Sequence, residues 1–272
     1  MKQLKFFLVA ILTIIIGGSV TSCMNTDSDP IYTDLAIAKA TSFISPTFQL
    51  ANGQKLVVTN ATADTYNEGQ LYVFYYQYNT EEQAWNAPTL NVTLYQGSTP
   101  TSISAKSAEG PVSSTSATAA NAPLYTVEGY VAGLGEVNPM LYTNEFLILP
   151  LVYWVANSTS ETELATELNK HSFIVNYDIE SLTSTNTELV LTVNHVVDTS
   201  NDPTDLKRDK YTYTTKAYSL SNAVSAFHAK TGNYPLSIKV KAITNITKNS
   251  LNSQDGAKEE SSQSLPIKFT VN

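Results

Sequence analysis

The chain is poor in the side chains that most metal sites and many hydrolytic sites require. Its 272 residues include a single cysteine and three histidines. One cysteine excludes an internal disulfide and any metal or iron–sulfur site built from several thiolates. The histidines stand at positions 171, 195 and 228, so the HExxH pattern of zinc hydrolases is absent. GxSxG and GxxxxGK[ST] sequences are missing too, which leaves no motif for a nucleophile elbow or a phosphate-binding loop.

Positive charge is also scarce. The chain carries 16 Lys and Arg against 24 Asp and Glu, for a formal charge of −8. Proteins that bind nucleic acid need a basic face to neutralise phosphates, so nucleic acid is excluded as a partner. With 42% hydrophobic residues the chain can form a core, and its length allows one or two domains. Its 16 tyrosines favour strands over helices.

The N-terminus has the features of a secretory signal. Lys2 and Lys5 precede an apolar run over residues 6–16 that only Thr13 interrupts. This run is shorter than the roughly 20 residues of a membrane-spanning helix. The sequence Val20-Thr21-Ser22-Cys23 that follows resembles the lipobox of bacterial lipoproteins. The resemblance implies that residues 1–22 are removed and that Cys23 is acylated; an ordinary signal peptide with an incidental cysteine is the alternative.

Cleavage before Cys23 makes the mature chain more acidic. It removes two lysines and no acids, so the net charge changes from −8 to −10. Anionic headgroups repel such a body, and attachment to a membrane must therefore come from the acyl chains. The polar tether over residues 23–32 carries Asp27 and Asp29. It resembles the export signal of Bacteroides-type surface lipoproteins, which implies the outer membrane and the cell surface, with the periplasmic leaflet as the alternative.

Residues 33–130 read as a first β domain. Asn52-Gly53 lies between two apolar runs and predicts a tight hairpin, because both central positions of such a turn need positive φ. Residues 71–78 are almost continuously apolar or aromatic, which is typical of a strand covered on both faces or rolled into a barrel. We therefore predict a small barrel here. Residues 107–123 are rich in Ser, Ala and Thr and predict a long exposed loop.

Residues 131–272 predict a second all-β domain, a β-sandwich. Its longest apolar run, residues 146–155, contains Pro150, which requires a bulge or a sheet edge. Further strands are expected at residues 173–177, 189–197, 210–218, 236–243 and 267–271. Short helices are predicted over residues 160–168 and 219–230. The glycine-rich residues 129–135 are interpreted as a flexible hinge.

The order of these features resembles the NigD-like family of Bacteroides-type lipoproteins. The similarity rests on Asn52-Gly53-Gln54, on residues 69–75 and 103–106, and on residues 138–148. It implies an OB-fold-like barrel followed by an immunoglobulin-like β-sandwich. Because no biochemical activity is established for that family, the resemblance concerns fold and location.

Two groups of residues are candidates for ligand binding. OB-folds bind ligands on faces with aromatic rings, so the barrel could offer a platform for a glycan or a protein. Its candidates are Tyr72, Tyr75, Tyr76, Tyr78 and Trp85. The alternative is that the tyrosines simply fill strand positions. An oxygen-rich loop could bind Ca²⁺ through Asp198, Asp202, Asp205 and Asp209. There the alternative is a solvated hairpin tip, because Pro203 breaks the spacing and Lys207 and Arg208 add positive charge.

The sequence thus favours a non-enzymatic envelope lipoprotein that acts as a binding or assembly module at the outer membrane, with no cofactor. A glycan-binding lipoprotein of a polysaccharide-uptake system is the second hypothesis. An envelope hydrolase is the third, and it would require His195 or His171 in a cleft beside a serine or a carboxylate.

Overall fold

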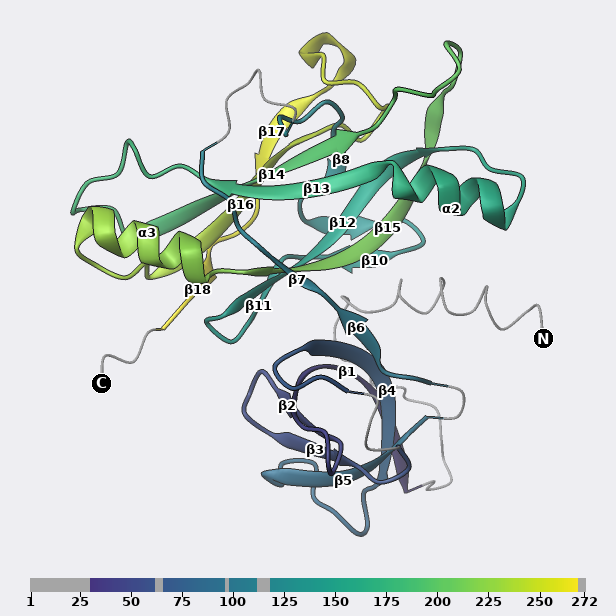
Figure 1. The fold of residues 1–272 in the computed structure, drawn as a ribbon, viewed down its shortest axis with the longest axis vertical. Coiled ribbons are helices and arrows are strands. Elements are labelled where there is room, and N and C mark those ends of the chain that lie inside the picture. Colours follow the sequence, from purple (N-terminus) through teal and green to yellow (C-terminus); the bar gives the residue numbers. More distant parts are fainter. Residues whose placement is uncertain (1–29, 62–65, 96–97, 112–117, 269–272) are drawn as a thin grey trace. The chain divides into compact units, whose positions relative to one another are not determined.

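The computed structural model describes residues 30–61, 66–95, 98–111 and 118–268 (Figure 1). Residues 1–22, Cys23 and most of the tether lie outside the described residues, as does the middle of the loop predicted at 107–123. The chain divides at about residue 105 into two compact units, which are described separately. The division therefore falls earlier than the expected boundary after residue 130, because Glu109, Ala122 and Leu124–Thr126 pair with strands of the second unit.

The first unit is a closed barrel. Its strands are β1 (Ile31–Ser42), β2 (Thr47–Leu50), β3 (Lys55–Val58), β4 (Leu71–Asn79), β5 (Thr89–Leu94) and β6 (Thr101–Ile103). The sheet runs β1-β2-β3-β5-β4, and pairing of β1 with β4 closes it. Only β3 and β5 are parallel. This is the five-stranded OB-fold order, and the predicted barrel is confirmed; β6 adds to β4.

Small residues on one barrel strand face large residues on the next. Ala36 of β1 lies opposite Phe74 of β4, and Ala38 lies opposite Tyr72. Phe48 of β2 is fully buried among these rings, with its centroid 4.7 Å from that of Phe74. Alternation of small and large side chains fills the narrow interior of a small barrel. The aromatic residues of β4 thus form its core.

The second unit holds the remaining strands and both α-helices of the part of the chain that the structure describes. Its first strands are β7 (Ala105–Ser107), β8 (Leu124–Thr126), β9 (Gly129–Val131), β10 (Gly135–Val137), β11 (Met140–Tyr142) and β12 (Phe146–Ala156). They are followed by α2 (Glu161–Asn169), β13 (His171–Tyr177), β14 (Glu188–Val197), β15 (Arg208–Ser219), α3 (Ser221–Thr231), β16 (Ser237–Thr244), the 3-10 turn η3 (Ser253–Asp255), β17 (Lys258–Ser261) and β18 (Leu265–Pro266). Figure 1 shows α2 and α3 on opposite sides of this unit.

The long strands of the second unit belong to one continuous sheet that curls almost back on itself. Its order is β13-β14-β16-β8-β12-β15-β7. The chain after β7 then reaches β13, where Glu109 pairs with Asn176. Inside, Tyr218 of β15 donates a hydrogen bond of 2.8 Å to the carbonyl of Phe173 in β13. The all-β class is confirmed, with the two halves of one sheet packed around a shared core.

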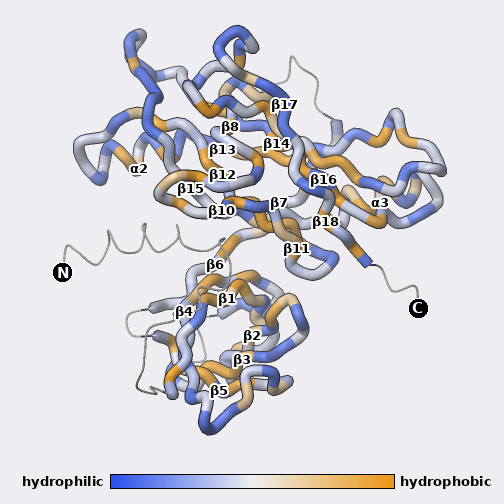
Figure 2. Tube along the Cα trace, turned by 180° about the vertical axis from the view of Figure 1, so that it is seen from behind, coloured by the Kyte–Doolittle hydropathy of each residue, from blue (hydrophilic) through white to orange (hydrophobic). Residues whose placement is uncertain are grey.

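Apolar side chains follow the inward positions of these strands. On β12 the core residues include Leu147, Leu149 and Leu151, and on β14 they include Leu189 and Leu191. Figure 2 shows hydrophobic colour along the strands, while the longer loops of this unit are mainly hydrophilic. The outward positions of β14 are only partly buried.

Pro150 lies in the longest strand without interrupting a ladder. It faces Thr215 of β15 on one side. On the other side β12 pairs with β11 up to Ile148 and with β8 from Val152 onward. Because proline has no N–H to donate, this gap between two short strands accommodates it. The sheet edge that Pro150 was expected to need is therefore the short stretch of β12 between its pairings with β11 and with β8.

Other local predictions have different outcomes. Residues 129–135 are not a hinge: they form the β9–β10 hairpin, whose Val131 and Val137 pack on Val152. The predicted helices are confirmed as α2 and α3. Most of the strand predicted at residues 267–271 lies outside the described residues; just before it, Leu265–Pro266 form the short strand β18.

Candidate functional site

The predicted aromatic platform on the barrel is wrong for most of its members. Tyr72, Tyr76 and Tyr78 are 4%, 5% and 6% exposed, because alternate residues of β4 point into the closed barrel. Tyr75 is partly buried, and Trp85 is 75% exposed in the loop after β4. These side chains therefore do not share one accessible face. The alternative interpretation, that the tyrosines fill strand positions, describes the barrel.

The four aspartates proposed for Ca²⁺ do not converge. Asp202 forms ion pairs with Lys170 and with Arg208, whose nitrogen lies 2.8 Å from its carboxylate. Asp198 accepts a hydrogen bond from the backbone N–H of Ser200. Asp205 and Asp209 take no part in this network, and in the described part of the chain no three His, Cys, Asp or Glu side chains are placed to hold a metal. The side chains of Lys170 and Arg208 therefore neutralise the carboxylate of Asp202.

Two histidines that are far apart in sequence meet in the interior of the second unit. His171 begins β13 and His195 lies near the end of β14; Nδ1 of the first is 2.9 Å from Nε2 of the second. Nδ1 of His195 lies 3.0 Å from the carbonyl oxygen of Pro123. Nε2 of His171 lies 3.3 Å from Oε1 of Glu167, one helical turn earlier. The sequence named both histidines, but not their contact.

Burial and nearby charges set the protonation of this cluster. Burial lowers the pKa of His195 to about 3. Burial also lowers the pKa of His171, although the adjacent carboxylate of Glu167 opposes the shift. Burial would raise the pKa of Glu167, but hydrogen bonds from the backbone N–H of Ala156 and from Arg208 hold it below its usual value. We therefore expect two neutral imidazoles beside a charged carboxylate.

The histidine cluster is closed to solvent. The side chain of His171 has 0% exposure, and His195 is 1% exposed. Tyr153 of β12 packs against both rings, with centroid distances of 4.8 and 5.5 Å. The arrangement joins β12, β13, β14 and α2, and no substrate reaches it in this conformation.

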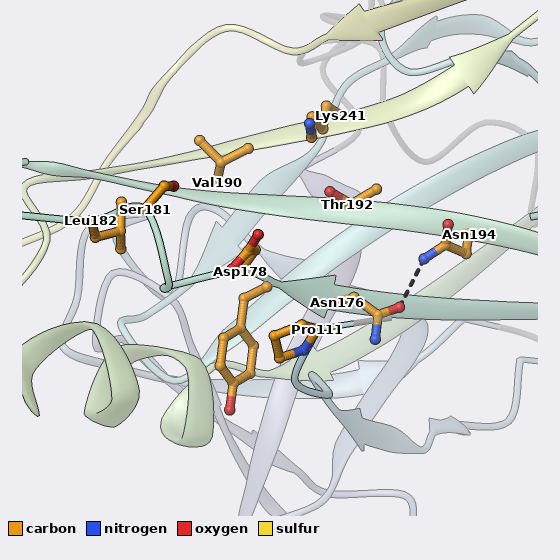
Figure 3. A pocket seen from close by; sticks show the side chains of 10 residues that line it. Pro111, Asn176, Asp178, Ser181, Leu182, Val190, Thr192, Asn194 and Lys241 are labelled. Carbon is orange, nitrogen blue, oxygen red and sulfur yellow. Dashed lines mark hydrogen bonds between the residues drawn. The ribbon is translucent and has the colours of Figure 1, made fainter. Parts of the chain in front are cut away.

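An open pocket lies on the outward face of β13, β14 and β16. Its volume is about 430 Å³, and Figure 3 shows the side chains around it. Asn176, Thr192 and Lys241 stand abreast on the three strands, because Thr192 pairs with both of the others. Asn194 lies two residues further along β14 on the same face. Asp178 and Pro111 line its rim from neighbouring loops.

Hydrogen bonds fix the amides of this pocket. Asn176 is 4% exposed and donates from Nδ2 to the carbonyl of Gly110 at 2.7 Å. Its Oδ1 accepts a 2.8 Å hydrogen bond from Nδ2 of Asn194, drawn dashed in Figure 3. The sequence did not single out these residues: it predicted only that residues 173–177, 189–197 and 236–243 form strands. Which polar residues stand side by side depends on strand order and register.

Solved structures with a related fold come from Bacteroides and Parabacteroides species. A candidate lipoprotein from Bacteroides fragilis shares 23% identity, covers 89% of this chain and 100% of its own, and has a TM-score of 0.69. A protein of unknown function from Bacteroides vulgatus shares 14% identity, with 88% and 92% covered and a TM-score of 0.54. An uncharacterised protein from Parabacteroides merdae shares 13%, with 88% and 100% covered and a TM-score of 0.50.

No family model and no curated protein matches the chain. The three solved structures cover both units, so the likeness extends over the OB-fold barrel and the curled sheet together. At these identities it concerns the fold. The chain therefore has the two-unit all-β fold of these Bacteroides and Parabacteroides proteins.

Proposed function

We propose that this chain is a non-enzymatic lipoprotein of the bacterial cell envelope, anchored through acyl groups on Cys23 and acting as a binding module at the outer membrane. The position of its only cysteine carries the proposal. Six residues, 17–22, separate Cys23 from a signal-type apolar run that ends at residue 16, and the first barrel strand begins at Ile31. The eight-residue separation between Cys23 and Ile31 spans at most about 30 Å when the chain is fully extended. A lipid on Cys23 would therefore hold the barrel close to the membrane surface.

The charge of the chain supports an anchor that consists of acyl chains. Among the described residues, no helix is long and apolar enough to cross a membrane. A chain cleaved before Cys23 carries a charge of −10, so anionic headgroups repel it. Acyl chains attached to one cysteine supply hydrophobic binding energy that does not depend on protein charge.

Two features of the second unit favour binding over catalysis. Its buried imidazoles are enclosed by Tyr153 and Glu167 and are 0% and 1% exposed. Its open pocket is lined instead by amide and hydroxyl groups, by Asp178 and by Lys241, whose charge is paired with Glu259, and such groups bind ligands without activating them.

Membrane fractionation tests the anchor. The full-length chain is expressed in a Bacteroides host as the native sequence, as Cys23→Ala and as Met24→Ala. The native chain and Met24→Ala should incorporate labelled palmitate and sediment with outer membranes, whereas Cys23→Ala should do neither. Membrane association of Cys23→Ala equal to that of the native chain would refute the anchor.

Protease added to intact cells tests the leaflet. Digestion of the native chain in unbroken cells would place it on the cell surface. Protection until the outer membrane is permeabilised would place it on the periplasmic leaflet and would refute surface exposure.

A further inference from the structure

The pocket on the outward sheet face is built by three strands and is not a gap between loose loops. Asn176, Thr192 and Lys241 occupy one row across β13, β14 and β16. Their side chains share the outward face because paired residues in adjacent strands point to the same side. The volume of about 430 Å³ falls within the range of about 300–1,000 Å³ found for ligand pockets.

The Asn194 amide is held in one orientation. Asn176 uses Nδ2 on the carbonyl of Gly110 and Oδ1 on Nδ2 of Asn194. Since an amide nitrogen has two hydrogens, Asn194 keeps one N–H and its carbonyl oxygen for another group. A fixed amide that both donates and accepts suits a hydroxyl group, which also does both. Thr192, two positions away on the same face, offers a second such partner.

The pocket has little net charge. Lys241 is the cation of the row, and its Nζ lies 3.3 Å from the carboxylate of Glu259. Asp178 is the anion at the rim. Phosphate and nucleotide sites use unpaired basic groups or clusters of backbone N–H donors. The lining therefore favours an uncharged ligand.

Apolar surface accompanies the polar row. Val190 precedes Thr192 on the outward face of β14, and Leu182 and Pro111 face the same space (Figure 3). A pyranose ring presents hydroxyl groups at its edge and C–H groups on its face, so it can satisfy both kinds of surface. A purely apolar ligand would leave Asn194 and Thr192 unpaired, which costs free energy.

We infer that this pocket binds an uncharged saccharide unit, with its hydroxyl groups on Asn194 and Thr192 and its C–H face toward Pro111, Val190 and Leu182. The inference rests on the proposed function, because it names the ligand class of the binding module. It moves the binding site from the barrel aromatics to the second unit.

Binding can be measured on the acylated native chain in micelles of a detergent without a sugar headgroup. Neutral mono- and oligosaccharides are first screened on a glycan array, and the strongest binder is titrated by calorimetry. Thr192→Val removes the hydroxyl but keeps the shape of the side chain, and Thr192→Ser restores a hydroxyl. Val196→Thr, on the outward face of the same strand but outside the pocket lining, is the matched control.

The native chain, Thr192→Ser and Val196→Thr should bind within about twofold of one another. Thr192→Val should bind about fivefold to tenfold more weakly, in keeping with about 1 kcal/mol for a neutral hydrogen bond. Asn194→Ala should abolish detectable binding. Circular dichroism checks that each variant is folded.

Three results would overturn the inference. One is the lack of any neutral saccharide binder for a native chain that is folded and acylated. Another is saccharide binding that Thr192→Val and Asn194→Ala leave unchanged. The third is a preference for inorganic phosphate or a dipeptide over every neutral saccharide. Fractionation of Cys23→Ala is scored separately, so failure of the saccharide inference and failure of the anchor are distinguishable.

Discussion

Nδ1 of His171 and Nε2 of His195 lie 2.9 Å apart inside the second unit, and this pair links two acceptor oxygens. One end is the carbonyl of Pro123, and the other is the carboxylate of Glu167. Three hydrogen bonds in this series need three ring protons, but two neutral imidazoles carry only two. One contact must therefore lack a proton. The contact with Glu167 is the longest, at 3.3 Å.

The protons of the pair are expected to be distributed in one way. The Pro123 carbonyl and the Glu167 carboxylate can each only accept, and the contact with Pro123 is the shorter, at 3.0 Å against 3.3 Å. His195 is therefore expected to carry its proton on Nδ1, and its Nε2 accepts from Nδ1–H of His171. Long-range ¹⁵N–¹H correlation spectra of the folded chain at pH 7 should show both rings as neutral Nδ1–H tautomers. A proton on Nε2 of His171 at this pH would contradict the assignment.

Acid should destabilise the second unit before its carboxylates titrate. Burial lowers the pKa of both His171 and His195 below the ordinary value of 6.5. The unfolded chain therefore binds protons that the folded chain does not, and the free energy of unfolding falls as the pH drops from about 6.5 toward 3. Glu167 and Asp202, whose pKa values are also lowered, add to the loss below about pH 5, as the unfolded carboxylates begin to bind protons.

Urea unfolding at pH 7, 5.5 and 4.5, followed by the fluorescence of the buried Trp154, measures this loss. His195→Asn removes one buried imidazole. The free energy of unfolding of this variant should be lower than that of the native chain at pH 7, but it should vary less between pH 7 and pH 4.5. An increase in the stability of the native chain on acidification would show that the protonated pair is preferred.

Glu167→Gln should destabilise the second unit strongly. Arg208 contacts this carboxylate at 2.7 Å through Nε, and its own side chain is only 6% exposed. Removing one partner of a buried ion pair costs about 3–5 kcal/mol when the other charge is left unpaired. Arg208 keeps its ion pair with Asp202, so the loss should not exceed about 3 kcal/mol. Thermal unfolding measures the loss. Glu161→Gln, at an exposed position on the same helix, should change stability by no more than about 0.5 kcal/mol. Equal effects of the two variants would contradict the role of the pair.

Phe48→Ala should weaken the barrel without affecting the second unit. Phe48 is fully buried and packs against Tyr66, Tyr72 and Phe74, so its removal should cost about 3–5 kcal/mol. Hydrogen exchange measured by mass spectrometry should speed up in the peptides of β1 to β5. The urea midpoint reported by Trp154 should stay unchanged. Ile44→Ala, at a residue that is 77% exposed, is the control. Loss of both units together would show that they unfold cooperatively.

Local signals in the sequence predicted several elements correctly. Asn52-Gly53 forms the turn between β2 and β3, with Gly53 at a φ of 88°, where other residues are strained. The Ser160 side chain accepts from the N–H of Glu163 and begins α2. Gly232, at a φ of 77°, ends α3. Each of these depends on neighbours within a few residues.

The candidate sites depended on contacts between distant segments. The nearly continuous apolar and aromatic run of β4 did not show which residues face which way. Only closure of the barrel against β1 decided that Tyr72, Tyr76 and Tyr78 face the interior. In the same way, Lys170 and Arg208 reach Asp202 from other elements.

The sequence by itself determined the acidic charge, the all-β class and most strand positions, and it predicts a signal and a lipobox at Cys23, because these follow from composition and local pattern. Tertiary structure alone decided that His171 meets His195, and that Asn176, Thr192 and Lys241 stand in one row. The physical reason is that the register of hydrogen-bonded strands sets which distant side chains become neighbours. Neither the register nor the order of the strands follows from the sequence of a single strand.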